Sequence, residues 1–532
     1  MVKRSCDEAD KAIIEERAPK RVRLSRPDRL STLSDELILR TLSFLPLADL
    51  TLCGRLSRRL KSLATDGQLW KSLYYDRFVR PRASRIPGIR NQGPCRGALH
   101  YASKISKWLD DEKLVSRGRL TDWKQQYKLR HNWSRGSAKV RETEVAKQPS
   151  SPPLLVRLHE DVIVIADQEH GLRAWSLKEE HRLIASHSLG KDNGRPAVAP
   201  TSLALDGGKS SKDGLLVMVG FLDGSFSAYT LQKNNSCFEH RYSHPASSTG
   251  NLSAIACSSP FLLTMTLEPR LSLYYFGSDT SEGKEMEPPR LLSSLKSHTA
   301  YPPISLAIRS SASNIVASIA FAMPSYMPKW TVGVQELRLS ASGEILDSRV
   351  AFASQPQRKS TANPAHVDML GVLPLPSSRP ASLSYNHPYL LTAHPDNTLT
   401  LYMVTSTSSE VDISPGTILW GHTSSISSAH VGDRGKAVSI STRGNELRVW
   451  ELEGRGSSNP AAPLRHCYLG EQSSVRVHLE VNEPDKDQKG VRHPISTVNE
   501  IAKGWIAFDE EKVVLLREKM QGQQAVVVYD FT

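Results

Sequence analysis

Residues that could carry out catalysis are scarce in this sequence. The 532 residues contain no phosphate-binding GxxxxGK[ST], no GxSxG nucleophile turn and no HExxH metal motif. The 17 histidines do not cluster at metal-ligand spacing, and none of the six cysteines forms a CxxC pair. We therefore expect no catalytic residue, no metal site and no cofactor.

Carboxylates recur instead at similar turns along the chain: Glu169, Asp223, Glu268 and Asp396. Even spacing favours a structural role, in which each side chain accepts hydrogen bonds from the backbone of a hairpin. His422 is likewise predicted to be a buried residue of a strand structure rather than a ligand.

These turns belong to a sequence repeat. Each copy has turn residues followed by a strand. We call the residue at the end of this strand the anchor, and it is aromatic in all copies but the fourth: Trp175, Tyr229, Tyr274, Gln335, Tyr402, Trp450 and Tyr529. Two residues after each anchor stands another apolar residue: Leu177, Leu231, Phe276, Leu337, Val404, Leu452 and Phe531. An apolar strand precedes most copies across a tight turn, so the repeat predicts blades of a β-propeller.

Seven copies predict seven blades. Because the fourth copy is weak, six or eight blades are the alternatives. The sixth copy has Gly421-His422 before Trp450-Glu451, which resembles the Gly-His and Trp-Asp signature of WD repeats. The others lack it, so the repeats are of a degenerate WD type. Three inserts, near 278–303, 340–381 and 453–500, are expected to be surface loops.

The excess positive charge lies in the first 150 residues. Lys and Arg number 68 against 55 Asp and Glu, a formal charge of +13. Residues 1–150 hold 33 basic and 17 acidic side chains, and residues 151–532 hold 35 and 38. The chain is therefore not basic throughout, as a nucleic-acid coat protein would be, and a domain boundary is expected near residue 150.

Neither a membrane helix nor a secretory signal is expected. No apolar run approaches the roughly 20 residues that a membrane helix needs. The start of the sequence has no apolar region of the kind that a signal peptide requires. The cysteines are then expected to be reduced thiols inside the cell.

Residues 1–29 are predicted to be a disordered basic tail. Lys20, Arg21 and Arg23 form a compact cluster that resembles a single-cluster nuclear import signal. The alternative is a solvated tail without that role. A nuclear and/or cytoplasmic location is expected, with the nucleus favoured.

Residues 30–78 predict four short helices with more apolar surface than so small a core can bury. Asp35 and Glu36 follow Ser34, a helix-capping residue, and Pro46 separates the first helix from the second. Such a bundle usually needs a partner to cover its apolar surface.

This segment resembles the F-box. The matching residues are Leu33, Glu36-Leu37-Ile38, Leu42-Ser43-Phe44-Leu45, Asp49-Leu50, Ser57-Arg58, Leu63-Ala64 and Leu69-Trp70. The family's first proline is replaced by Ser34, and its usual tryptophan after the arginine pair by Leu60. The resemblance implies docking onto a Skp-type adaptor through Leu33, Leu37, Ile38, Leu42, Leu45, Pro46, Leu50 and Trp70.

Residues 79–153 are predicted to be a basic helical connector, with helices near Ala98–Leu109 and Thr121–Asn132. Trp123, Tyr127, Asn132 and Trp133 resemble the connector between the F-box and the propeller in F-box/WD-repeat proteins. An amphipathic helix that docks through Trp123 and Tyr127 would have the same pattern.

The expected fold is an α+β multidomain one: tail 1–29, F-box 30–78, connector 79–153 and an all-β propeller 154–532. The resemblance to F-box/WD-repeat proteins, of a fungal type, implies a non-catalytic substrate receptor of an SCF-type cullin–RING ubiquitin ligase. Its partners would be a Skp-type adaptor, a cullin bound through that adaptor, and an unidentified protein substrate on the propeller.

The alternative is a nuclear WD-repeat scaffold whose basic region 79–141 contacts phosphates. Nucleic acid is not favoured, because the arginines there are not interleaved with stacking aromatics apart from Trp108, Trp123 and Trp133.

Overall fold

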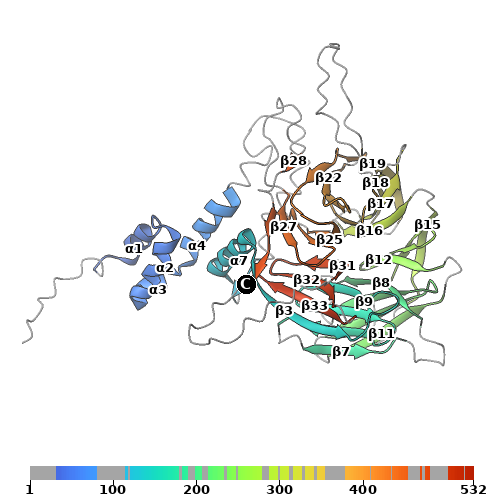
Figure 1. Cartoon of the computed structure of the whole chain (residues 1–532), viewed down its shortest axis with the longest axis horizontal. Helices are drawn as coiled ribbons and strands as arrows, with labels where there is room; N and C mark the ends of the chain where they lie inside the picture. The colour runs from blue at the N-terminus through green and yellow to red at the C-terminus, as the bar shows by residue number, and fades with distance from the viewer. Residues whose placement is uncertain are drawn as a thin grey trace, which may run out of the picture. The chain divides into compact units, whose positions relative to one another are not determined.

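A computed structural model of the chain is shown in Figure 1. It describes residues 32–80, 114–117, 120–178, 182–189, 198–206, 214–232, 236–246, 250–277, 287–296, 300–310, 315–325, 330–340, 344–353, 378–407, 409–432, 434–452, 468–469, 474–479, 501–519 and 522–532. The chain divides into two units, Met1–Leu73 and Tyr74–Thr532.

Four short helices form the first unit where the structure describes it, from residue 32, as the sequence predicts. They are α1 (Asp35–Leu42), α2 (Leu47–Leu56), α3 (Arg58–Ala64) and α4 (Gly67–Tyr74), whose last residue begins the second unit. One π-helical turn, η1 (Tyr75–Val79), follows α4.

Polar side chains and a proline set the helix boundaries of the first unit. Ser57 accepts a hydrogen bond from the Leu60 N–H at 3.1 Å, and Asp66 accepts one from the Gln68 N–H at 2.9 Å. Pro46 precedes α2 in an extended conformation. Ser34 stands at the N-cap of α1, but its side chain accepts no helix N–H. The acidic residues of the first turn, Asp35 and Glu36, still complement the helix dipole there.

Among the described residues, seven mainly antiparallel sheets of four or more strands make the second unit a seven-bladed propeller, which confirms the predicted count (Figure 1). The first four blades are β4–β7 (Leu155–His159, Val162–Asp167, Gly171–Ser176, Leu183–His187), β8–β11 (Pro200–Asp206, Leu215–Phe221, Phe226–Gln232, Cys237–His244), β12–β15 (Leu252–Ser258, Phe261–Thr266, Arg270–Tyr275, Arg290–Lys296) and β16–β19 (Tyr301–Ser310, Ile315–Pro324, Trp330–Leu339, Ile345–Phe352).

The last three blades contain segments that are distant in the sequence. The fifth has β20–β24 and β28 (Ser382–Asn386, Tyr389–Ala393, Leu399–Ser406, Val411–Ile413, Thr417–Leu419, Tyr468–Leu469), the sixth β25–β27 and β29 (Ile426–Val431, Lys436–Ser441, Leu447–Glu451, Ser474–Arg476), and the seventh β31–β33, β3 and β30 (Ile501–Phe508, Lys512–Glu518, Gln524–Asp530, Ser137–Ala146, His478–Leu479). The strands β4, β8, β12, β16, β20, β25 and β31 contact one another in a closed circle, so they are the innermost strands of the ring.

The ring closes through a strand from before the first blade. β3 pairs antiparallel with β33, from Lys139 opposite Asp530 to Ala146 opposite Gln524. β3 lies in the range 79–153 that was expected to be a helical connector, so this part of the range is a strand of the last blade. Backbone hydrogen bonds within the last blade therefore connect the chain before the first blade to the chain's final strand.

The repeat residues occupy the positions that the sequence pattern predicts. The seven apolar residues two positions after the anchors are all 9% exposed or less. The weak fourth copy is a full blade, because β17 and β18 pair without a break from Ile315–Leu339 to Pro324–Trp330.

The three inserts, expected to be surface loops, contain outer strands. β15, β19 and β29 complete the third, fourth and sixth blades from these inserts. Outer strands have one side in water and mixed polarity, as in the largely exposed β15 and β19. Apolar periodicity therefore missed them, because their ladder hydrogen bonds come from backbone groups.

One helix of the connector is described, α7 (Trp123–Arg135), after the small hairpin β1–β2 (Ser116–Arg117, Leu120–Thr121). The predicted helix Ala98–Leu109 lies outside the described residues. Gly136 ends α7 in the left-handed conformation, with φ of 69°. Its carbonyl accepts the His478 N–H at 2.7 Å, and a Cβ at this glycine would contact the backbone carbonyl of Arg476.

We predict that Gly136→Ala destabilises the propeller by about 2 to 3 kcal/mol, because positive φ and a backbone clash act together. Gly250 has φ of 84° but no atom within 4 Å of the position that a Cβ would take, so Gly250→Ala is the matched control. We expect Gly250→Ala to lower the free energy of unfolding by about 1 kcal/mol, because only the positive φ disfavours alanine there. Urea unfolding of both variants measures the difference, and equal losses would contradict a clash at Gly136.

Candidate functional site

An apolar surface on the small helical unit is the strongest candidate site. Large hydrophobic side chains there are well exposed: Leu33 36%, Leu37 55%, Phe44 72%, Leu52 53% and Leu56 72%. They come from α1, from the turn after it, from α2 and from the segment before α1. Exposed aliphatic and aromatic side chains gathered on so small a unit indicate a protein-binding surface.

The eight residues predicted to contact an adaptor divide into two groups. Ile38, Leu42, Leu50 and Trp70 are between 1% and 4% exposed and form the core of the bundle. Leu33, Leu37 and Pro46 are exposed, and Leu45 is partly buried. Buried side chains cannot meet a partner directly, so the first group supports the surface that the second group presents.

Sequence reasoning missed Phe44, Leu52 and Leu56 as surface residues. Phe44 belongs to the F-box pattern, and Leu52 and Leu56 are four residues apart on α2, which places them on one helix face. Helical spacing identifies apolar faces but does not say which face turns inward. Arg40 lies over the exposed ring of Phe44, with its guanidinium carbon 4.8 Å from the ring centre.

Two polar contacts hold the bundle that supports this surface. Arg59 of α3 donates to the Asp35 carboxylate at 2.6 Å and to the Leu33 carbonyl at 2.6 Å, which fixes the start of α1. The Trp70 indole donates to the Ala64 carbonyl at 2.7 Å, which fixes α4 against α3. Trp70, which was predicted to contact an adaptor, therefore holds two helices of the bundle together from inside.

Within the second unit, α7 has an aromatic end. Trp123 lies 5.6 Å from Tyr74 and 5.9 Å from Tyr75, and Tyr127 lies 5.3 Å from Phe78, measured between ring centres. The Tyr127 hydroxyl also accepts a hydrogen bond from Arg77 at 2.6 Å. Docking through Trp123 and Tyr127, predicted from the sequence, is therefore confirmed.

The other end of α7 binds the last blade. The Trp133 ring stacks on Phe531 at 4.0 Å, and its indole donates to the Glu510 carbonyl at 2.9 Å. Asn132 donates to the Phe531 carbonyl at 2.7 Å. Glu510 also pairs with Arg130 at 3.3 Å. These contacts anchor the connector helix beside the closing strand.

His422 is buried in the sixth blade, as predicted, and it takes part in a hydrogen-bonded network there. The Ser439 hydroxyl lies 2.6 Å from His422 Nε2 and accepts from the Trp450 indole at 2.8 Å. Burial lowers the pKa of His422 to about 4, despite the nearby Glu446. Burial acts to raise the pKa of Glu446, but hydrogen bonds from Thr423 and Arg448 lower it to about 2. A neutral imidazole and an ionised carboxylate therefore join the strands of this blade.

The turn carboxylates have the structural role predicted for two of them. Asp223 accepts from the Ser225 N–H at 2.9 Å, and Asp396 accepts from the Thr398 N–H at 3.2 Å. In the first copy the corresponding contact comes from Asp167, which accepts from the His170 N–H and pairs with Arg173. Among the described residues, no group of three or more metal-binding side chains is found.

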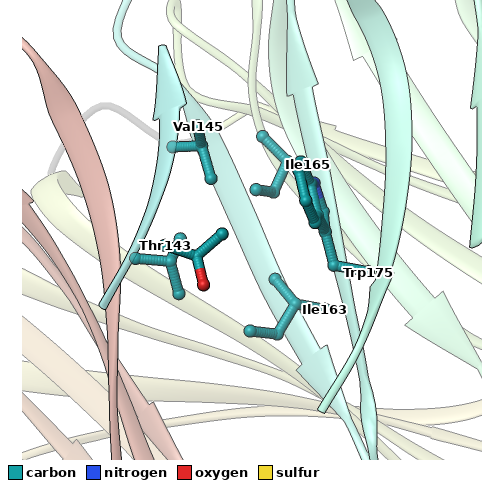
Figure 2. Close-up of a pocket in the computed structure, with 6 residues that line it drawn as sticks. Thr143, Val145, Ile163, Ile165 and Trp175 are labelled. Atoms are coloured by element: carbon teal, nitrogen blue, oxygen red, sulfur yellow. The ribbon is translucent and has the colours of Figure 1, made fainter. Parts of the chain in front are cut away.

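A gap between the closing strand and the first blade is too small for a ligand. It has a volume of about 10 Å³ and is lined by Thr143, Val145, Ile163, Ile165, Trp175 and Val526 (Figure 2). This is the space of about one water molecule. It therefore does not serve as a substrate site.

The remaining predictions concern the import cluster, the basic region and membrane helices. The import cluster Lys20, Arg21 and Arg23 and residues 81–113 of the basic region 79–141 lie outside the described residues. In the described part of the chain, no helix is long and apolar enough to span a membrane.

These observations define a class of protein, an F-box protein with a seven-bladed β-propeller of WD type. Residues 31–76 match the family model described as F-box-like, and residues 138–532 match the one described as F-box protein pof12 beta-propeller. The second match covers about three quarters of the chain, so the chain belongs to the family of pof12-type F-box propeller proteins. No match was found among curated proteins.

Solved propeller structures are similar to this chain, and each comparison covers 74% of it. The WD40 beta propeller domain of Doa1 has 11% identity, 96% of its own chain covered and a TM-score of 0.34. The Myceliophteria thermophila Cps50 (Swd1) beta-propeller domain has 12%, 100% and 0.39, and Saccharomyces cerevisiae Sqt1 has 8%, 99% and 0.35.

We predict that acidification weakens the propeller through His422. Its pKa is about 6.5 in the unfolded chain and about 4 when folded, so the unfolded state binds the proton first. The stability that the neutral imidazole gives is complete above about pH 6.5 and is lost as the pH falls towards about 4, by roughly 3 kcal/mol at most.

Unfolding by urea at several pH values, with His422→Gln as the comparison, measures this loss. Glutamine keeps a polar group near Ser439 but does not titrate in this range. The variant should be less stable near pH 7 and should lose less on acidification. Parallel pH profiles for the two proteins would show that His422 is not the titrating group.

Proposed function

We propose that the protein is the substrate receptor of an SCF-type cullin–RING ubiquitin ligase. The observation that carries this proposal is the exposed apolar surface of Leu37, Phe44, Leu52 and Leu56 on the unit that matches the F-box-like family. We assign this surface to the Skp-type adaptor, which in turn binds the cullin. The propeller binds a protein substrate.

The receptor carries out no bond chemistry in this proposal. It holds a substrate lysine near the ubiquitin-conjugating enzyme and so raises the effective concentration of the reacting groups. The structural roles of His422, Asp223 and Asp396 agree with a binding protein, because these polar groups serve the strands and turns of the propeller.

Several arginine side chains on the propeller are candidates for binding a substrate, and their contacts exclude some of them. Arg173 pairs with Asp167 and Arg448 with Glu446, and both arginines are largely buried. Their charges are therefore engaged inside the fold. Arg443, by contrast, is exposed in a turn between strands and is free to contact a substrate in this proposal.

We predict that Leu37→Ala with Phe44→Ala weakens adaptor binding at least about tenfold. Both side chains are exposed, so their truncation removes contact area and leaves the core of the bundle intact. Isothermal titration of the full chain with purified Skp-type adaptor measures the change. Leu267→Ala with Leu291→Ala removes similar exposed side chains from the propeller and is the matched control.

Undiminished binding by Leu37→Ala with Phe44→Ala would reject this surface. Leu42→Ala is not suitable for the same purpose, because Leu42 is 3% exposed and its loss leaves a cavity that costs about 2 to 5 kcal/mol. Weak binding by that variant would report an unfolded bundle instead of a lost contact.

We also propose that the protein acts in the nucleus, on the basis of the cluster Lys20, Arg21 and Arg23. Replacing the three residues by alanine should shift a fluorescent fusion of the full chain towards the cytoplasm. A fusion with Lys139→Ala and Arg141→Ala, two basic residues of β3, controls for lost charge alone. An unchanged distribution of the triple variant would remove the import role.

A further inference from the structure

The outer strand of the fourth blade, β19, is more apolar than the other outer strands. Four of its eight residues are large, exposed hydrophobics: Ile345 42%, Leu346 55%, Val350 48% and Phe352 47%. The outer strands β7 and β15 each have one such residue, Leu183 and Leu291. A long apolar edge strand is a ready template for pairing with another strand.

In the part of the chain that the structure describes, β19 is the edge strand of its blade. β19 pairs with β18 from Phe352 opposite Gly333 to Ile345 opposite Leu339, and among the described residues no strand pairs with its other side. Two other outer strands, β24 and β3, have that side covered within the chain. β28 pairs parallel with β24, and β30 pairs parallel with β3.

The two faces of β19 have different surroundings. Arg349 pairs with the fully buried Glu336 at 3.3 Å and lies 3.5 Å from Asp347, so these residues share the face that turns to the fifth blade. On the other face, Ser348 accepts from Gln335 at 3.2 Å, and the Phe352 ring lies 6.4 Å from Phe321. The face with Ser348 also includes the exposed Val350.

The order of residues along β19 is self-complementary. Around Ser348 the chain reads Leu346, Asp347, Ser348, Arg349, Val350, with opposite charges on either side of the centre and apolar residues beyond them. Antiparallel pairing of two copies about a two-fold axis at Ser348 places Asp347 opposite Arg349 of the second copy. It also places Val350 opposite the exposed Leu346, which is a favourable apolar cross-strand pair. Arg349 is already paired with the buried Glu336 and its side chain is 9% exposed, so this apolar pair makes the main contribution to the contact.

We propose that β19 binds β19 of a second copy of this chain and forms an edge-to-edge homodimer. The contact is isologous, since each strand offers the same residues to the other. A register shift against β18 near Ile345 places two exposed apolar residues, Ile345 and Leu346, where Val350 of the partner would arrive. The same shift shortens the regular ladder, so the dimer is weak, with a dissociation constant in the micromolar range.

Sedimentation of the full chain from roughly 1 to 100 µM tests the association. We expect a monomer–dimer equilibrium that Leu346→Lys with Val350→Lys weakens at least about tenfold, because like charges then face each other. Leu183→Lys on the outer strand of the first blade is the matched control and should dimerise as the native chain does. A monomer throughout, or a dimer that the double lysine variant keeps, would overturn the proposal.

The exposed apolar surface of the helical unit, with Leu37 and Phe44, requires a second control, because it could also bind a second copy of the chain. Leu37→Ala with Phe44→Ala should still dimerise through β19, so failure of this proposal and failure of the proposed function give different results. A dimer lost in that variant would place the contact on the helical unit and overturn the role of β19.

Cross-linking tests the register. Ser348→Cys places two thiols directly opposite at the two-fold axis, at about 4.5 to 5.5 Å between Cβ atoms, so mild oxidation should yield a covalent dimer. Leu346→Cys puts its two thiols several residues apart, and it should cross-link no more than the native chain. Equal cross-linking of both variants would reject pairing about Ser348.

Discussion

The propeller depends on one set of backbone hydrogen bonds, those between β3 and β33. This pairing joins residues near 140, before the first blade, to residues near 530 in the last one. α7 reinforces the same place, where Trp133 stacks on Phe531 and Asn132 bonds to its carbonyl. Because blades pack side against side around a circle, closure of the ring gives the first and the last blade two neighbours each, as all the other blades have.

In the helical unit, one set of apolar residues forms the core and another set stays exposed. Ile38, Leu42 and Leu50 fill a core too small to cover the rest of the apolar surface, and Leu37, Phe44, Leu52 and Leu56 remain in water. A bundle of this size cannot bury both sets. The residues left outside are therefore the ones from which we infer a partner, and the buried residues keep them in place.

Much of the fold could be predicted because the repeat residues are apolar and regularly placed. The positions of Leu177, Phe276 and Phe531 all proved to be buried. Outer strands such as β15 and β19 could not be predicted in this way, since their backbone pairs with a neighbour while their side chains stay largely exposed. The role of β3 was missed for a related reason, because its partner lies almost 400 residues further along the chain.

The sequence by itself determined the class of the protein: the order of helix breaks in residues 30–78 and the spacing of the anchors were sufficient for an F-box and a propeller. Only the tertiary structure decided which side of each apolar element faces water. Ile38 and Leu37 are adjacent and both apolar, yet one is 4% and the other 55% exposed. Local sequence records the chemistry of a side chain, whereas burial depends on neighbours that distant parts of the chain supply.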